Sequence, residues 1–459
     1  MTKDLVRQLR LKNDGSLAHL VSENLSCVGN LTFILENIGH IQKDFDYSWL
    51  LELIDYDNET VRILVIKNLG KIKSTALLQT FYNIANSDRS TLVKREAVSA
   101  IGRLRNKQTK ELLLKLLRNP DPKIVCQAIR GLLVFKGDKK IDAELKNLIM
   151  HENEIVQAVI KKEYFSDTKA KKDTLKHPET YDFLKNVIVN ADVLETLKLV
   201  PDESIHLTFT SPPYYNARDY SIYPSYDAYL QFLGNVFKAT HRITKEGRFL
   251  IVNTSPVIVP RISRAHSSKR YPIPFDLHAI LIKQGWEFID DIVWEKPEYS
   301  VKNRVGGFQQ HRKPLGYKPN TITEYLMVYR KQTDKLLDWN IHQYDYETVE
   351  KSKVKGDFDT NNVWQICPKS DKIHPAVFPA ELCKRVIQYY SYIGDLIFDP
   401  FAGSGTLGYV AKKLKRNFFL TEKNERYFEY MKSYKQEISE NELQNTKFYT
   451  LEQFKESIK

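Results

Sequence analysis

The sequence predicts a chain of two parts, an all-α array of repeated helices followed by an α/β unit built on a parallel sheet. Three observations carry this prediction. Apolar residues recur about every 32 residues in the first third, and segments of strand and helix character alternate from residue 183 onward. A polar, lysine-rich stretch separates the two regions. The 459 residues exceed what one hydrophobic core usually supports, which agrees with more than one domain.

A valine near the start of each unit defines the repeat. Successive valines are separated by 32, 32 and 31 residues, at Val61, Val93, Val125 and Val156. Each unit continues with apolar residues at helical spacing, and an aspartate precedes three of the valines, where we expect helices to start. These aspartates are Asp57, Asp88 and Asp121. A unit this short can bury its apolar face only against its neighbours, so the pattern is typical of an α-solenoid.

The units resemble HEAT repeats, and the resemblance covers roughly residues 45–165. Residues 1–45 are expected to form either a cap or a further divergent unit. We therefore predict a HEAT-like domain over residues 1–165, a linker over 166–182 and a second domain over 183–459.

The strongest local signal in the second domain is the segment DLIFDPFAGSGTLGYVAKKL, residues 395–414. An apolar strand is predicted to end at Asp399, a glycine turn follows, and a helix begins near Thr406. Gly403 and Gly405 permit a tight turn and a close approach of the backbone to a ligand. The next predicted strand ends at Glu422, where a nucleotide-binding fold places a carboxylate that accepts hydrogen bonds from ribose hydroxyls. The second phosphate-binding glycine pattern is missing, which favours S-adenosylmethionine over NAD.

A second motif, TFTSPPYYNARDY at residues 208–220, ends another apolar run. Two adjacent prolines cannot continue a central strand, because neither donates a backbone N–H. The motif therefore predicts a rigid elbow that displays the hydroxyl of Ser211 and the rings of Tyr214 and Tyr215.

The segments FDPFAGSGT and TSPPY together resemble the amino-methyltransferases that modify exocyclic nitrogens of DNA bases. The catalytic motif lies N-terminal to the cofactor motif, the permuted order of the β-class, and the resemblance covers roughly residues 183–435. It implies a Rossmann-like, S-adenosylmethionine-dependent methyltransferase domain, and no metal is expected. The resemblance and the glycine turn assign cofactor binding to Asp192, Phe378, Pro379, Asp399, Pro400, Phe401, Gly403, Ser404, Gly405, Thr406 and Glu422. The family's usual glycine before the first of these acids is Ala191 here.

The resemblance assigns catalysis to the elbow, at Ser211, Pro212, Pro213 and Tyr214. An exocyclic amine is a poor nucleophile, because its lone pair is delocalised into the base. A hydroxyl that accepts one N–H bond and a carbonyl that accepts the other steer the nitrogen towards a tetrahedral, attacking state. We expect the Ser211 hydroxyl and the Pro212 carbonyl to do this, while Tyr214 stacks on a base extruded from the duplex. Tyr215 is expected to form a second wall.

The identity of residue 211, a serine, is also the basis for predicting the target base. In the family, S-P-P-Y goes mostly with cytosine N4 and D-P-P-Y with adenine N6, so cytosine N4 is predicted and adenine N6 is the alternative. An RNA substrate is a further alternative. From another class, the HEAT-like array could be a binding scaffold attached to an inactive enzyme, but the intact motif residues argue against that interpretation.

The formal net charge of +12 points to a polyanionic partner. Residues 260–275 hold four basic and no acidic residues, and residues 296–318 hold six basic residues and one acidic residue. Both segments also carry aromatic rings, so we expect them, together with the irregular region 331–371, to recognise double-stranded DNA. The predicted contacts are Arg261, Arg264, Lys269, Arg270, Lys302, Arg304, Arg312 and Lys313.

The resemblance further implies the modification enzyme of a restriction–modification system, with a cognate restriction endonuclease as a partner. The HEAT-like array would then extend the DNA footprint, hold the endonuclease or stabilise the fold. No run of 18 or more apolar residues occurs and the N-terminus is charged, so a cytoplasmic location is expected rather than a membrane or secreted one.

Overall fold

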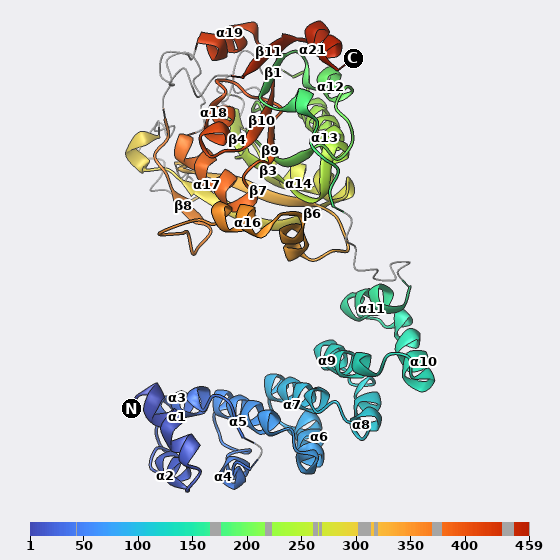
Figure 1. Cartoon of the computed structure of the whole chain (residues 1–459), viewed down its shortest axis with the longest axis vertical. Helices are drawn as coiled ribbons and strands as arrows, with labels where there is room; N and C mark the ends of the chain where they lie inside the picture. The colour runs from blue at the N-terminus through green and yellow to red at the C-terminus, as the bar shows by residue number, and fades with distance from the viewer. Residues whose placement is uncertain are drawn as a thin grey trace. The chain divides into compact units, whose positions relative to one another are not determined.

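The computed structural model describes residues 1–42, 44–165, 176–215, 223–259, 265, 269–301, 314–315, 320–369, 379–433 and 445–458. The chain divides into two compact units, Met1–Asp173 and Thr174–Lys459 (Figure 1). None of the helices in the described ranges has the length and apolar character needed to traverse a bilayer.

The first unit is all-α, as predicted. Its helices are α1 (Lys3–Lys12), α2 (Ser16–Ser22), α3 (Val28–Asn37), α4 (Ser48–Glu52), α5 (Glu59–Ile72), α6 (Leu78–Ser87), α7 (Thr91–Arg103), α8 (Thr109–Leu116), α9 (Pro122–Leu132), α10 (Lys139–Asn147) and α11 (Glu154–Ile160). The four valines that define the repeat lie on α5, α7, α9 and α11, and all four are fully buried. Helix α5 packs on α7 and α7 packs on α9, so each unit buries its apolar face against the next. Helix α3 packs on α5 within the same apolar core, as either a further repeat or a cap would.

Helix starts in this unit differ in part from the prediction. Of the three aspartates expected to start helices, only Asp121 caps one, at α9. Asn58 and Ser90 cap α5 and α7 instead. Asp88 is turned towards Arg62, which donates to both of its carboxylate oxygens at 3.0 and 3.1 Å. The prediction was wrong there because a buried ion pair between neighbouring repeats uses the carboxylate that would otherwise cap the helix.

The second unit is built on a nine-stranded sheet of order β11-β1-β10-β9-β2-β3-β7-β6-β8. The strands are β1 (Val187–Asn190), β2 (Ile205–Thr210), β3 (Thr244–Thr254), β6 (Trp286–Glu295), β7 (Thr323–Lys331), β8 (Val363–Gln365), β9 (Leu396–Asp399), β10 (Asn417–Glu422) and β11 (Lys447–Thr450). The predicted α/β fold is confirmed, and the strands from β11 to β3 are parallel. Strand β7 runs antiparallel to both of its neighbours, where parallel pairing was expected. The apolar pattern of a strand carries no information about its direction, which explains this difference.

Helices cover both faces of the sheet (Figure 1). One face is covered by α17 (Ala380–Tyr390), α18 (Thr406–Lys413) and α19 (Glu425–Ser433). The other is covered by α12 (Val193–Leu197), α13 (Tyr226–Ile243), α14 (Ile273–Lys283) and α21 (Leu451–Ser457). Side chains alternate between the faces as a pleated strand requires: in β10, Phe418 and Leu420 pack on the first face and Phe419 on the second.

The direction of winding reverses between β2 and β9. After β9 the chain crosses through α18 to β10, and after β2 it crosses through α13 to β3 on the opposite side. Open α/β sheets bind their ligands in the crevice outside the carboxyl ends of the strands at such a reversal. The fold therefore predicts a binding site at the ends of β2 and β9.

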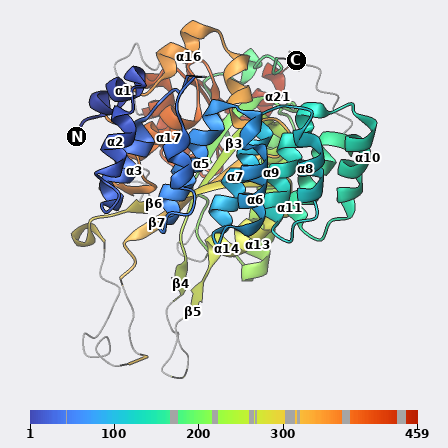
Figure 2. The same cartoon turned by 90° about the horizontal axis from the view of Figure 1, so that it is seen from below.

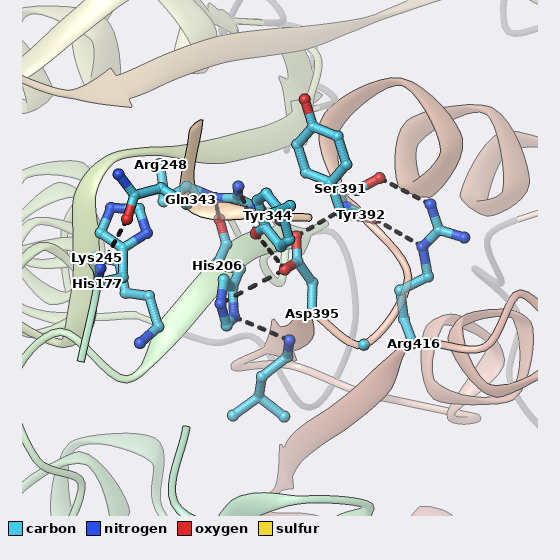
Figure 3. A network of polar contacts seen from close by, with 12 residues as sticks. His177, His206, Lys245, Arg248, Gln343, Tyr344, Ser391, Tyr392, Asp395 and Arg416 are labelled. Atoms are coloured by element: carbon cyan, nitrogen blue, oxygen red, sulfur yellow. Dashed lines mark hydrogen bonds and ion pairs between the residues drawn. The ribbon is translucent and has the colours of Figure 1, made fainter. Parts of the chain in front are cut away.

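A buried polar network closes the opposite, amino-terminal edge of these strands (Figure 3). Asp395 forms an ion pair with Arg248 and accepts a 2.5 Å hydrogen bond from the Tyr344 hydroxyl. Although burial acts to raise it, the charges of Arg248 and His206 hold the pKa of Asp395 below its ordinary value. This buried network at the amino-terminal ends of the strands therefore stabilises the fold.

The network also holds part of the region 331–371, which was expected to be irregular. This region contains a 3-10 helix, η7 (Leu337–Gln343), the helix α16 (Tyr346–Ser352) and β8, which extends the sheet. Near the end of the predicted linker, His177 lies 3.0 Å from the carbonyl of Glu246 on β3. Both segments are thus tied to the sheet more firmly than their polar sequences indicated.

Candidate active site

The two sequence motifs meet at the carboxyl ends of β2 and β9. The strands are adjacent and parallel, with Thr208 opposite Phe398. The Thr210 hydroxyl donates to Asp399 Oδ1 at 2.6 Å, and the backbone N–H of Phe401 donates to the same oxygen at 3.0 Å. The elbow that begins after Thr210 is therefore fixed beside the glycine turn that begins after Asp399.

Asp399 is an unusual carboxyl group at this junction. It is 1% exposed. Burial raises its pKa to about 7, against the hydrogen bonds from Thr210 and Phe401, and the charge of Glu422 adds to the rise. A cationic group placed beside Asp399 would favour its ionised form.

The glycine turn has the conformation that its sequence demands. Gly403 and Gly405 have φ values of 54° and 77°, in the left-handed region that favours glycine. A Cβ on Gly405 would also lie 2.7 Å from the sulfur of Met431. Helix α18 begins at Thr406, where the sequence predicted it. The turn therefore presents backbone without side chains at the carboxyl end of β9.

Acidic residues end or follow the three neighbouring strands β9, β10 and β1. Glu422 ends β10, and its carboxylate accepts hydrogen bonds from Gly403 N at 2.8 Å and Asn424 N at 2.7 Å. Burial raises the pKa of Glu422. Asp192 follows β1, whose Asn190 is in register with Glu422, and it caps α12. Together with Asp399, these residues form a row of carboxylates along the edge of the sheet, which suits a ligand with several hydroxyl and amino groups.

The remaining predicted cofactor residues lie around the same turn. The ring of Phe401 packs against Phe232 at 6.0 Å, and the hydroxyls of Ser404 and Thr406 are 3.1 Å apart. Pro400 accepts a 2.8 Å hydrogen bond from Thr421 through its carbonyl. Pro379 caps α17, and Phe378 falls outside the described residues.

The elbow contains a polar contact that the sequence did not predict. Ser211 and Tyr214 are half-buried, and the Tyr214 hydroxyl donates to Glu324 Oε2 at 2.8 Å. Glu324 also pairs with Lys296. Lys296 belongs to the basic segment 296–318 that is predicted to recognise DNA, and its charge is paired here with a carboxylate, with the two side chains 18% and 15% exposed. No local pattern indicates these contacts, because each joins residues that are distant in the sequence.

The second tyrosine of the motif does not form a wall of the site. Tyr215 is 7% exposed and packs among Tyr226, Tyr229 and Tyr271, with ring centroids 5.4, 5.6 and 4.9 Å away. The expectation that Tyr215 would face an extruded base was therefore wrong. Its apolar ring is used to anchor the elbow in the core.

Comparison with known proteins agrees with this geometry. Residues 205–433 match a family model described as DNA methylase, and residues 78–161 match HEAT repeats. The second unit belongs to the N6/N4 DNA methylase family. The Type II beta methyltransferase M.BslI of Bacillus sp. strain NEB-606 is 26% identical over 67% of this chain and 35% of its own length.

A second relative is matched over most of its length. The Type II methyltransferase M.Cfr9I of Citrobacter freundii is 29% identical over 52% of this chain and 84% of its own length. This chain thus spans about a third of M.BslI and most of M.Cfr9I. Among solved structures, the cytosine-N4-specific PvuII DNA methyltransferase is 21% identical, with a TM-score of 0.42, over 60% of this chain and 98% of that chain.

A basic hairpin lies next to the elbow of the methylase unit. It consists of β4 (Val257–Val259) and β5 (Lys269–Tyr271), and Figure 2 shows it projecting from this unit. Lys269 and Arg270 are exposed on β5, while Tyr271 at its base packs on Tyr215. The other predicted DNA contacts fall outside the described residues: Arg261, Arg264, Lys302, Arg304, Arg312 and Lys313.

Proposed function

We propose that the protein is a site-specific DNA methyltransferase that transfers a methyl group from S-adenosylmethionine to N4 of cytosine in double-stranded DNA. The observation that carries the proposal is the hydrogen bond between Thr210 and Asp399. It places an S-P-P-Y elbow directly beside a glycine turn, at the point of the sheet where such folds bind ligands. Membership of the N6/N4 DNA methylase family supports methyl transfer to an exocyclic nitrogen of a DNA base.

The residues at the crevice fit the proposed cofactor. The half-buried Glu422 carboxylate has lone pairs left for the ribose hydroxyls, and Asp192 follows the next strand, β1, where it would meet the adenosine. Asp399 and the bare backbone of Gly403 and Gly405 would border the methionine end. When bound, the cofactor supplies a methyl group on a sulfonium, a good leaving group that requires no covalent enzyme intermediate.

The elbow would prepare the acceptor nitrogen. The Ser211 hydroxyl and the Pro212 carbonyl accept the two N–H bonds of the amine and draw its lone pair out of conjugation with the base. The prolines fix these acceptors in advance, so little reorganisation is needed. Tyr214 stacks on the base after its extrusion from the duplex.

Serine at the first position of the motif supports cytosine over adenine, as the resemblance to S-P-P-Y enzymes implies. The matched Type II methyltransferases support a role as the modification enzyme of a restriction–modification system with a cognate endonuclease. We further propose that Lys269, Arg270 and the six basic residues outside the described ranges contact DNA, together with segments 260–275, 296–318 and 331–371. The all-α domain over residues 1–165, joined by the linker 166–182, would extend that contact or hold the endonuclease.

Analysis of product nucleosides tests the reaction. Purified protein is incubated with duplex DNA and methyl-labelled S-adenosylmethionine, and the DNA is then digested to nucleosides. Labelled N4-methylcytosine is expected, and Ser211→Ala should abolish most of it. Labelled N6-methyladenine alone would contradict cytosine as the target base. The absence of label from all of the digested nucleosides would contradict the methyltransferase activity.

A further inference from the structure

A chain of polar contacts leads from the elbow into the antiparallel pair β6 and β7. Glu324 is the second residue of β7, in register with Trp294 on β6, and Lys296 follows β6 directly. Lys296 pairs with Glu324 and lies 4.5 Å above the ring of Trp294. The side chains of the pair are 18% and 15% exposed, so water screens their interaction less than that of a surface pair.

The pair fixes the role of the Tyr214 hydroxyl. A phenol has one O–H, and Tyr214 donates it to Glu324 at 2.8 Å. Burial and the charge of Glu324 raise the pKa of Tyr214, so this proton stays on the phenol. In contacts with its other neighbours, the Tyr214 oxygen can therefore only accept hydrogen bonds.

Two serine hydroxyls use that acceptor. Ser211 and Ser255 are the side-chain hydrogen-bonding neighbours of the Tyr214 oxygen. Because the one proton of the phenol is directed at Glu324, each serine can only be the donor in its contact with that oxygen. A serine hydroxyl has one proton and two lone pairs. Once the proton of Ser211 points at Tyr214, only its lone pairs remain for any group that enters the site.

We propose that the Lys296–Glu324 pair is a positioning element for methyl transfer, which sets the direction of the hydrogen bonds at the elbow so that Ser211 presents lone pairs to the amine. The consequence for the reaction rests on the proposed function, whereas the hydrogen-bond chain itself does not. Glu324 and Lys296 act through Tyr214 and Ser211 and do not touch the reacting atoms. Without Glu324, the Tyr214 proton can turn back towards Ser211, and the serine can then turn its own proton towards the amine.

A double-mutant cycle with single-turnover rates tests the proposal. Tyr214→Phe and Glu324→Ala are each expected to lower the rate of methyl transfer about tenfold, the scale of a lost hydrogen bond to a charged group. The dissociation constants for S-adenosylmethionine and DNA should stay within about twofold of wild type, because neither variant removes a binding group. The double variant should be no slower than the slower single variant, since both changes break the same chain. A double variant about a hundredfold slower than wild type would overturn the proposal.

Two further variants separate positioning from general damage. Glu324→Gln keeps an acceptor oxygen and should recover part of the rate lost in Glu324→Ala. Glu246 forms a matched pair elsewhere in the unit, with Lys335 at 2.8 Å and with that lysine 4.0 Å above the ring of Trp339. Glu246→Ala should leave the rate unchanged, and an equal loss of rate in this variant would overturn the specific role of Glu324.

Fluorine NMR gives a readout that does not depend on activity. With 3-fluorotyrosine at position 214, the Glu324→Gln variant should show a lower phenol pKa than wild type, because the negative charge is gone. An unchanged pKa at position 214 would overturn the hydrogen-bond chain. A wild-type protein that methylates no DNA but shows the shift would instead overturn the proposed function and its catalytic consequence.

Discussion

The Thr210 hydroxyl and the Asp399 carboxylate are 2.6 Å apart, although 189 positions separate them along the chain. Their hydrogen bond joins the half of the sheet that carries the elbow to the half that carries the glycine turn. The contact exists because β2 and β9 are parallel neighbours whose carboxyl ends stop at the same level. The proposed site therefore depends on the pairing of two strands that are far apart in the sequence.

The first prediction concerns the pH dependence of cofactor binding. The pKa of Asp399 is about 7, so the ionised carboxylate that would attract the cationic cofactor forms as the pH rises through that value. Affinity for S-adenosylmethionine should increase between pH 6 and 8, by up to about tenfold per pH unit below pH 7. Calorimetric titrations across this range would measure it. In Asp399→Asn the dependence should vanish, and its persistence would contradict the assignment.

The same group affects stability with the opposite sign. Asp399 holds its proton in the folded state up to a pH of about 7, whereas its ordinary pKa is 3.8. Between these values the folded state binds more protons, so the free energy of unfolding should fall as the pH rises from about 4 to 7. The Asp399→Asn variant should show a smaller decrease across this window in denaturant titrations.

A substitution in the glycine turn should weaken cofactor binding. Gly405→Ala places a Cβ 2.7 Å from the Met431 sulfur at a φ of 77°, so the turn must move. Gly356 offers a matched control, because its φ is 83° and nothing lies within 4 Å of an added Cβ. We expect Gly405→Ala to lower the affinity for S-adenosylmethionine at least about tenfold in calorimetry. Gly356→Ala should bind normally, with a backbone cost of about 1–2 kcal/mol in stability.

The hairpin next to the elbow should contact DNA phosphates. Replacing Lys269 and Arg270 by alanine should weaken DNA binding and reduce the slope of log affinity against log salt by about 1.8, or about 0.9 for each lost contact. Fluorescence anisotropy at several salt concentrations would measure the slope. Lys198→Ala, an exposed lysine outside the proposed DNA-contacting segments, should leave it unchanged. An unaltered slope in the double variant would show that the hairpin does not contact DNA phosphates.

The buried network at the other edge of the sheet should matter for stability alone. Arg248→Met leaves the 1% exposed carboxylate of Asp395 without its cation, which should cost about 3–5 kcal/mol in the unfolding of the methylase unit. Thermal or denaturant unfolding would measure the loss. Asp182→Asn breaks an exposed pair with Lys185 and should cause no measurable change. A loss in Asp182→Asn equal to that in Arg248→Met would contradict the role of burial.

Local sequence patterns predicted the parts of this protein that depend on local physics. The turn at Gly403 and Gly405 and the helix start at Thr406 follow from glycine conformation and apolar spacing, and the buried Val61 follows from its repeat. Residues whose roles depend on distant partners were missed. Glu324 carried no functional prediction, because nothing in its neighbourhood indicates that its side chain meets Tyr214.

The fate of Tyr215 shows the same limit. In the sequence it directly follows the motif residue Tyr214, and it was expected to form a second wall beside that ring. Three tyrosines from α13 and β5 enclose it in the fold, and no local pattern shows that those elements converge there. Strand direction at β7 was missed for a related reason, since pairing is decided between strands and not within one.

Methylation-sensitive sequencing of DNA from cells that express the protein tests the central claim most directly. We expect N4-methylcytosine at one recurring sequence, present with the wild-type chain and absent with Ser211→Ala. Genomic DNA that carries no N4-methylcytosine in the wild-type strain, or carries it equally with Ser211→Ala, would contradict the account.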